Sequence, residues 1–297
     1  MAEKNSLDYY DRLFEEEYNS EESIWETEAD DGSTLKYEFD DYESEGLILR
    51  NRYETMAYAT NLTPYFEHGS KELSELSELS NRDNFKALLP DAVMTELQNW
   101  LGEVESRMIW IQGLPTHSYG SDLSLAALHI VSLLEDEDIP CISFFVKPRD
   151  HFAPSVPQHQ AALIALLYSI VAQLVYLLPV EFEDVDELDE AKFQKLDGSF
   201  GSVPLALQMI QALLRHAPPA LVWVLDGFHL AENQDTIPHL EALVDILLAQ
   251  ESVRISQVCF TTDSISAVLN SKMKQVCASE TGGSDINGLS IPSSRFY

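Results

Sequence analysis

The stretch from Arg107 to Leu134 constrains the fold of this chain more than any other. It reads RMIWIQGLPTHSYGSDLSLAALHIVSLL, which is an apolar run, a loop rich in Gly, Pro and Ser, and a long apolar segment. The pattern predicts a strand from Met108 to Ile111, a loop that opens at Gly113 and a helix from Leu123 to Leu134. In such a unit the loop amides and the positive end of the helix dipole point at one spot, which suits a phosphate group.

The rest of the chain repeats this alternation of apolar runs and helix-length segments. A helix is expected to begin near Pro90 and to end before Gly102. Three further runs have the character of buried strands: Cys141–Val146, Ala220–Leu225 and Ile255–Thr261. Three longer segments have the character of helices: His159–Leu178, Val203–His216 and Ile237–Gln250. The acidic segment Glu181–Glu190 is expected to be a loop. This alternation predicts an α/β fold with a parallel, doubly wound sheet flanked by helices.

Composition divides the chain into four parts. Residues 1–46 are crowded with Asp and Glu and predict a disordered acidic arm, although their interleaved Tyr, Phe and Trp residues leave open a docking segment that orders on a partner. Residues 47–83 are expected to form a linker with short helices, and residues 84–272 the α/β domain. Residues 273–297 turn to Ser, Gly and polar residues and predict a flexible tail.

The charge of the chain bears on its partners and its compartment. Its formal net charge is -32, from 50 acidic and 18 basic side chains. Nucleic acids and anionic membranes present dense negative charge, so neither is expected as a partner. The three cysteines are widely separated and form neither a disulfide framework nor a CxxC metal pattern, which fits a reducing compartment. The N-terminus has no apolar region like that of a secretory signal, so a cytoplasmic location is expected.

One apolar segment, Ala161–Leu178, is long enough to raise the question of a membrane span. It carries no charge, but Ser169 and Gln173 lie within it and Glu181 follows shortly after. A helix buried on the face of a parallel sheet is also apolar all round, because neither of its sides meets water. We therefore expect a buried core helix here rather than a membrane span.

The loop after the first strand resembles the phosphate-binding loop of P-loop NTPases, whose pattern is GxPGSGKSTL. In that loop, backbone amides and a lysine hold the phosphates, and a Ser or Thr hydroxyl binds Mg²⁺. Aligned on the pattern, GLPTHSYGSDL places Tyr119 at the lysine position and Gly120 and Ser121 at the metal-hydroxyl positions. The two internal glycines become Thr116 and Ser118, whose side chains restrict the positive φ values that glycine permits.

An acid at the end of another strand completes the comparison. In P-loop NTPases such a carboxylate helps to hold Mg²⁺, and a nearby acid or glutamine positions water. The run VWVLDGFHL keeps the first acid as Asp226 but has Phe228 and His229 where a second would follow. Asp226 and Ser121 would bind Mg²⁺ if a nucleotide binds. The candidate nucleotide-binding residues are therefore Gly113, Pro115, Ser118, Tyr119, Gly120, Ser121 and Asp226.

Five segments occur in the order found in the NACHT-type signalling NTPases of fungi, which belong to the STAND class: WLGEVESRMIWIQG, SFFV before a basic loop, LIALLYSIVAQL, LVWVLDGFHL and VCFTTDS. The chain resembles this family from about Asn84 to Asn270. In the family the last strand ends in a Thr/Ser-Ser-Arg turn that senses phosphate, whereas Asp263 stands there in this chain. The departures at Tyr119, His229 and Asp263 all fall on positions that handle phosphate.

The resemblance and these departures together imply a catalytically inactive pseudo-NTPase domain that acts as an intracellular interaction or regulatory protein. They predict no catalytic residue and no cofactor, and they predict protein partners. The alternative is a Mg²⁺-dependent nucleotide binder, or a slow NTPase switch with a non-standard phosphate loop, which would use Mg-ATP or Mg-GTP. The loss of one preorganised donor typically lowers an enzyme's rate by about 100- to 1,000-fold, so several replacements favour the first interpretation.

Overall fold

The centre of the protein is a single parallel sheet. The computed structural model describes residues 49–66, 89–113, 121–146, 156–183, 185–273 and 275–277. Its five-stranded sheet has the order β3-β5-β6-β2-β7, and all four pairings are parallel. The strands are β2 (Arg107–Gln112), β3 (Cys141–Phe145), β5 (Ala220–Asp226), β6 (Ile255–Thr262) and β7 (Gln275–Cys277). The predicted α/β class with a parallel sheet is confirmed.

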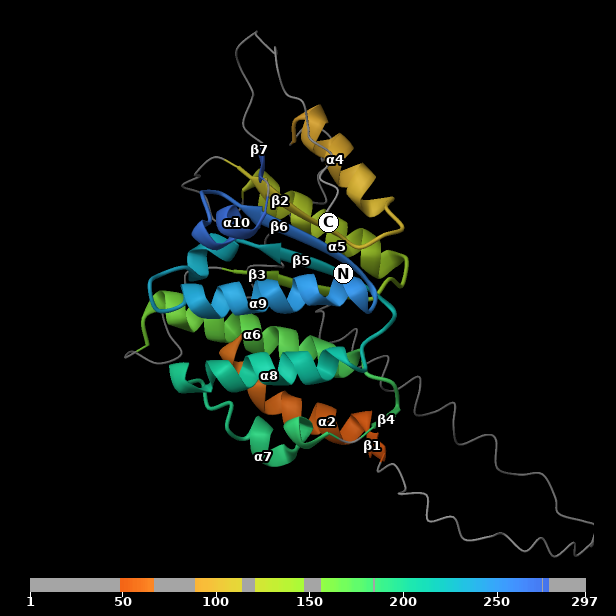
Figure 1. Ribbon diagram of the computed structural model, residues 1–297, viewed down its shortest axis with the longest axis vertical. Helices are drawn as coiled ribbons and strands as arrows, with labels where there is room; N and C mark the ends of the chain where they lie inside the picture. Colours follow the sequence, from red (N-terminus) through yellow and green to blue (C-terminus); the bar gives the residue numbers. More distant parts are fainter. Residues whose placement is uncertain are drawn as a thin grey trace, which may run out of the picture.

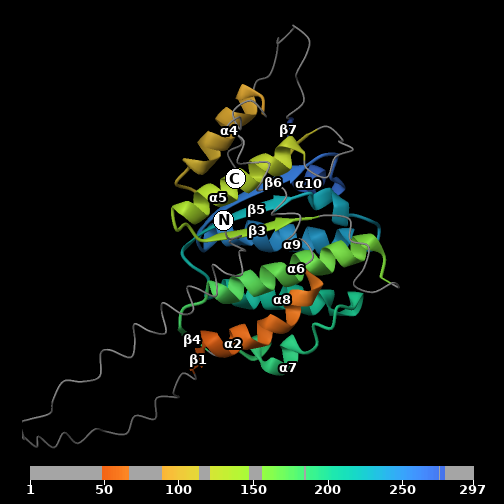
Figure 2. The ribbon, with the colours of Figure 1, turned by 180° about the vertical axis from the view of Figure 1, so that it is seen from behind.

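Helices cover both faces of this sheet (Figure 1, Figure 2). Side chains alternate between the faces along each strand, so Trp110 joins a larger core and its neighbour Ile111 a smaller one. The smaller core lies under α4 (Asp91–Leu101) and α5 (Asp122–Asp136). The larger core lies under α6 (Gln158–Tyr176), α9 (Ile237–Ala249) and α10 (Ala267–Lys272), with α8 (Val203–Leu214) packed on α6. This three-layer arrangement is compatible with a P-loop-like fold.

The long helices begin and end close to their predicted bounds. α4 begins after Pro90 and ends one residue before Gly102, and α6 and α8 each end two residues earlier than predicted. Short 3-10 helices connect the larger elements: η1 (Thr60–Tyr65), η4 (Asp186–Leu188), η5 (Phe200–Ser202), η6 (Phe228–Ala231) and η7 (Gln250–Ser252).

The apolar helix α6 is buried within the fold. Among the described residues it is the one helix long and apolar enough to cross a bilayer, and 78% of its apolar window is buried. Its polar residues have partners inside the protein. The Gln173 amide donates to the backbone carbonyl of Ser143 at 2.8 Å and accepts from the Ser143 amide at 2.9 Å. Because β3 is an edge strand, this side chain satisfies backbone groups that a neighbouring strand would otherwise pair. The arrangement is compatible with a soluble protein.

The acidic segment predicted as a loop contains regular structure. β4 (Glu181–Glu183) pairs antiparallel with β1 (Leu49–Asn51), and the segment continues into η4 and the start of α7 (Glu190–Phe193). The prediction was wrong because one buried residue, Phe182, fixes the strand while its two glutamates remain exposed. β1 leads into α2 (Arg52–Ala59), which packs with η1 against α6.

The predicted flexible tail also needs a correction. Residues 275–277 form β7, which pairs with β2 in the register Trp110↔Gln275. A three-residue strand in a polar context gives too short a pattern to be recognised from sequence. Its pairing partner is also about 165 residues away, so no neighbouring segment indicates it. Three predicted parts lie outside the described residues, in whole or in part: the acidic arm at residues 1–46, the end of the linker at residues 67–83, and the rest of the tail at residues 278–297.

We predict that Gly227→Ala destabilises the fold by about 2 kcal/mol or more. Gly227 follows β5 with φ 72°, and a Cβ atom there would come within 2.5 Å of the backbone oxygen of Val146. Urea unfolding would measure the change in the free energy of unfolding. Gly201→Ala is the matched control, because an added Cβ would meet only the Ser199 Oγ at 3.6 Å. Equal effects of the two substitutions would contradict this account.

Candidate functional site

The carboxyl ends of β2, β5 and β6 meet the amino end of α5, as the sequence predicts for a P-loop-like unit. Gly113 follows β2, and its amide donates to the Thr262 carbonyl at the end of β6, at 2.7 Å. Ser121 caps α5, its hydroxyl accepting from the Ser124 amide at 3.0 Å. Asp226 ends β5. The structure therefore brings three of the seven candidate residues to one end of the sheet.

The carboxylate of Asp226 is bonded inside the protein on both of its oxygens. Ser124 donates its hydroxyl to Oδ2 at 2.6 Å, and Thr261 donates its hydroxyl to Oδ1 at 2.5 Å. Asp226 is only 5% exposed, and Ser124 and Thr261 are also buried. Hydrogen bonds to an ionised carboxylate are about twice as strong as neutral ones. The acid thus ties α5, β5 and β6 together.

Ser124 is the residue that the loop alignment missed. The alignment selected Ser121 as the hydroxyl partner of a metal, three residues earlier. One signal could have found Ser124: it lies on the first turn of α5, where a hydroxyl reaches the acid that ends a neighbouring strand. The Ser121 and Ser124 hydroxyls are 3.1 Å apart, so Ser121 contacts the hydroxyl that bonds Asp226.

An apolar side chain packs directly against the first glycine of the loop. A Cβ atom at Gly113 would come within 2.8 Å of Cδ1 of Leu123, which is buried. If Ser124 rather than Ser121 takes the hydroxyl position of the phosphate-loop pattern, the lysine position falls on Leu123 instead of Tyr119, at the end of a loop about four residues longer than the pattern. The space next to Gly113 therefore holds a leucine rather than an ammonium group.

A second acid, Asp263, lies beside this end of the sheet. Its Oδ1 would be 3.5 Å from a Cβ at Gly113. Burial raises the pKa of the Asp263 carboxyl, a hydrogen bond from Ser121 opposes that shift, and the charge of Asp122 adds to it. Negative charge therefore accumulates where a phosphate would bind.

Four candidate residues, Pro115, Ser118, Tyr119 and Gly120, lie outside the described residues, so their part in a nucleotide site stays a prediction. Within the described ranges, no group of three or more His, Cys, Asp or Glu side chains is arranged to hold a metal ion.

His229 lies just beyond Asp226, on η6. Its Nδ1 is buried without a hydrogen-bond partner in the described part of the chain, and burial lowers the pKa of its imidazole to about 4. A neutral imidazole at physiological pH adds no positive charge for a phosphate.

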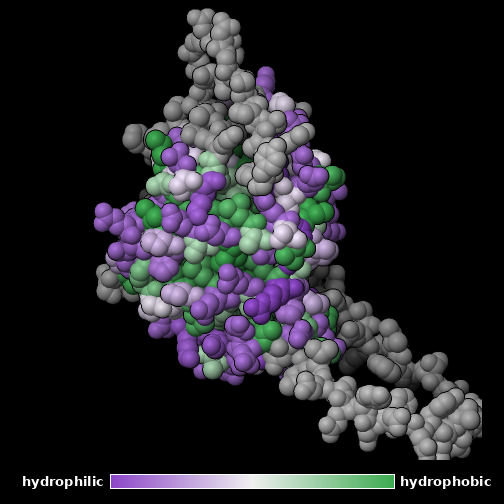
Figure 3. All heavy atoms as spheres, viewed as in Figure 1, coloured by the Kyte–Doolittle hydropathy of each residue, from purple (hydrophilic) through white to green (hydrophobic). Residues whose placement is uncertain are grey.

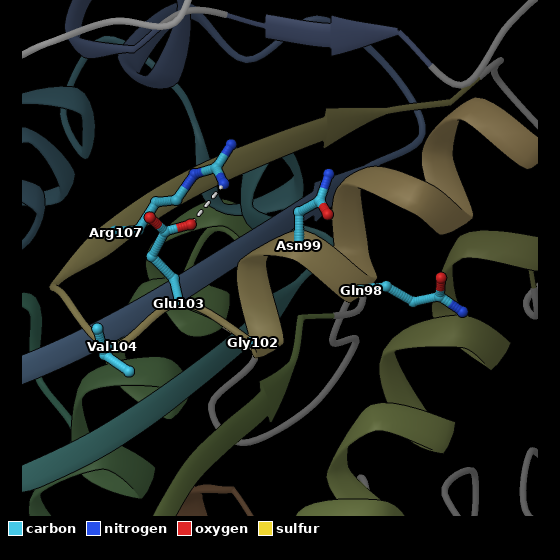
Figure 4. Close-up of a pocket in the computed structure, with 6 residues that line it drawn as sticks. All are labelled: Gln98, Asn99, Gly102, Glu103, Val104 and Arg107. Atoms are coloured by element: carbon cyan, nitrogen blue, oxygen red, sulfur yellow. Dashed lines mark hydrogen bonds and ion pairs between the residues drawn. The ribbon is translucent and has the colours of Figure 1, made fainter.

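A surface hollow of about 520 Å³ lies away from this site (Figure 4). It is lined by residues of α4 and of the connection into β2, and it includes Glu103 and Arg107. Arg107 begins β2 and Gly113 follows its end, so the hollow and the candidate site lie at opposite ends of the strand.

Comparison with known proteins identifies a family. Residues 93–278 match the family model described as Nephrocystin 3, N-terminal, which covers more than half of the chain and reaches from α4 to β7. The chain belongs to the nephrocystin 3 N-terminal family. No curated protein and no solved structure matched it. Because this N-terminal family is associated with NACHT proteins, the match supports the NACHT-like resemblance in general terms.

In this member of the family, we predict that Ser124→Ala lowers the free energy of unfolding by about 1.5–3 kcal/mol, because a buried carboxylate loses a charge-assisted hydrogen bond. Chemical denaturation would measure the change. Ser132→Ala on the same helix is the control, because the Ser132 hydroxyl is exposed and bonds only the backbone oxygen of Leu128. A Ser124→Ala protein as stable as the control would show that the Asp226 contacts contribute little.

The buried His229 predicts a pH dependence of stability. The imidazole has a pKa of about 4 in the folded protein against an ordinary 6.5, so only the unfolded chain takes up its proton between these values. The neutral His229 therefore costs no stability above pH 6.5, and the free energy of unfolding falls as the pH drops from 6.5 toward 4. We expect His229→Gln to reduce the drop in urea midpoint between about pH 7.5 and pH 5. His159→Gln, at an exposed histidine, is the control. A drop as large as in the unmodified chain would refute the assignment.

Proposed function

We propose that this chain is a catalytically inactive, degenerate NACHT-like domain: a pseudo-NTPase similar in sequence order to the signalling NTPases of fungi. It acts in the cytoplasm as an interaction or regulatory protein and exerts its effect through protein partners. The observation that carries the proposal is the closed hydrogen bonding of Asp226 with Ser124 and Thr261.

The geometry of Asp226 supports an inactive site. A metal ion at this carboxylate would have to compete with two hydroxyl hydrogen bonds, each worth about 1.5–3 kcal/mol because the acceptor is charged. The acid is also only 5% exposed, which limits the access of a metal ion to it.

The surroundings of the loop support the same conclusion. Leu123 packs against Gly113, and Asp263 is the charged group beside it. A carboxylate about 5 Å from a phosphate oxygen opposes binding by about 3 kcal/mol at an effective dielectric constant of about 20. The net charge of -32 adds a longer-range repulsion of nucleotides.

One observation favours the alternative, a Mg²⁺-dependent nucleotide binder. A hydroxyl on the first turn of the loop-following helix bonds the acid that ends a neighbouring strand, and Mg²⁺ is held by such a Ser and Asp pair in P-loop enzymes. In that case Ser124 and Asp226 would hold the metal, and the loop from Gly113 to Ser121 would hold the phosphates of ATP or GTP.

A thermal-shift titration of the full chain with ATP, GTP, ADP and GDP, with and without Mg²⁺, separates the two functions. A ligand at about 100 times its Kd stabilises the native state by about 2.7 kcal/mol, which is readily visible. We expect no Mg²⁺-dependent shift at millimolar nucleotide. A shift that disappears in Ser124→Ala but persists in Ser252→Ala, a remote exposed serine, would establish the nucleotide binder instead.

A further inference from the structure

The amino ends of the parallel strands carry an unusual concentration of exposed apolar side chains. Of the nine large exposed hydrophobic residues in the described ranges, six surround these strand ends. We call them the amino-edge surface: Leu101, Val104, Leu133, Ile139, Val253 and Ile255. Val104 is 81% exposed and Val253 71%. Hydrophobic residues are visible along the right edge of the molecule, where the α4–β2 connection, the end of α5 and the start of β6 meet (Figure 3).

Hydrogen bonds hold the first two segments of this surface together. Gln257 of β6 donates its amide to the carbonyls of Glu103 and Glu105, at 3.0 and 2.7 Å. Val104 lies between these two residues, so its side chain projects from a loop fixed against β6. The exposed Val104 side chain is therefore held in place by the hydrogen bonds on either side of it.

The surface continues across the next two strands. The Ile255 amide donates to the Pro219 carbonyl at the start of β5, at 2.9 Å. The Val222 amide of β5 donates to the Pro140 carbonyl at 3.0 Å, which places Ile139 beside the same edge. The apolar side chains thus follow the sheet order from β3 to β2, and the hollow lined by Glu103 and Arg107 lies at the β2 end (Figure 4).

Exposed carboxylates flank this apolar row and no free cation balances them in the described part of the chain. Arg107 is paired with Glu96 and Glu103, and the buried Arg254 donates to backbone carbonyls and to the Gln250 amide. The side chains around Glu135 shield its carboxyl partly from water, which raises its pKa, and the charge of Asp136 raises the pKa further, so like charges lie close together on this surface. Besides Glu103, which Arg107 already pairs, the flanking acids are Glu105, Glu135, Asp136, Glu137 and Asp138.

We propose that the amino-edge surface docks a basic amphipathic segment of a partner protein, with apolar side chains on the valine and isoleucine row and Lys or Arg against the flanking acids. This inference rests on the proposed role as an interaction protein. A second copy of the chain would place acids against acids, and the chain's own acidic arm carries the wrong charge for the same reason. Charge complementarity therefore selects a basic partner.

The test uses the full chain and a synthetic helical peptide of leucine and lysine, roughly 18 residues or five turns long. Fluorescence anisotropy gives its affinity at physiological salt, and a peptide with glutamate in place of lysine tests the charge. We expect the double variant Val104→Ser, Val253→Ser to weaken binding of the lysine peptide about tenfold. Ile265→Ser is the matched control, because Ile265 is 70% exposed but follows the carboxyl end of β6. Hydrogen exchange should show protection at residues 101–107 and 253–257.

Three results would overturn the docking proposal. The double variant binds as well as the control, which places the peptide on acidic residues elsewhere. The glutamate peptide binds as tightly as the lysine peptide. The chain self-associates as its concentration rises and the double variant does not, which would show that the surface is an interface between copies of the chain. A Mg²⁺-dependent nucleotide shift would instead overturn the inactive-domain proposal and leave the docking result intact.

Discussion

The buried carboxylate of Asp226 is the interaction on which the arrangement of this protein depends. Its two oxygens accept hydroxyl hydrogen bonds from Ser124 on α5 and Thr261 on β6, so one side chain links three elements that meet at the carboxyl ends of the strands. A buried carboxylate is costly unless hydrogen bonds satisfy it. Removal of one hydroxyl therefore leaves the buried charge less well compensated, and this explains why the site favours a fixed geometry.

The same end of the sheet shows how a P-loop-like scaffold could be kept without a phosphate site, as we propose for this chain. The fold needs the turn after β2, the cap of α5 and the acid that ends β5, and Gly113, Ser121 and Asp226 provide them. Phosphate binding needs positive charge and open space as well. In this chain Leu123 occupies the space beside Gly113, and Asp263 supplies a charge of the wrong sign. The structural and the chemical requirements are thus separable.

The fold could be predicted from sequence wherever burial leaves a long periodic pattern. α6 and β5 are continuous apolar segments because both of their sides meet protein, and their bounds followed directly. β4 and β7 were missed because three residues give too little pattern and each depends on a strand far away in the chain. Ser124 was missed for a related reason, since its partner is 102 residues away and its position on the first turn of α5 was the one local signal.

The proposed function rests on the Asp226 carboxylate being closed to metal, and hydrogen–deuterium exchange with and without Mg-ATP tests this most directly. Peptides that cover the start of α5 and the ends of β5 and β6 report on the atoms concerned. We predict identical exchange in these peptides at millimolar Mg-ATP. Slower exchange around Ser121 and Ser124 that requires both Mg²⁺ and nucleotide would contradict this account and show that the site still binds nucleotide.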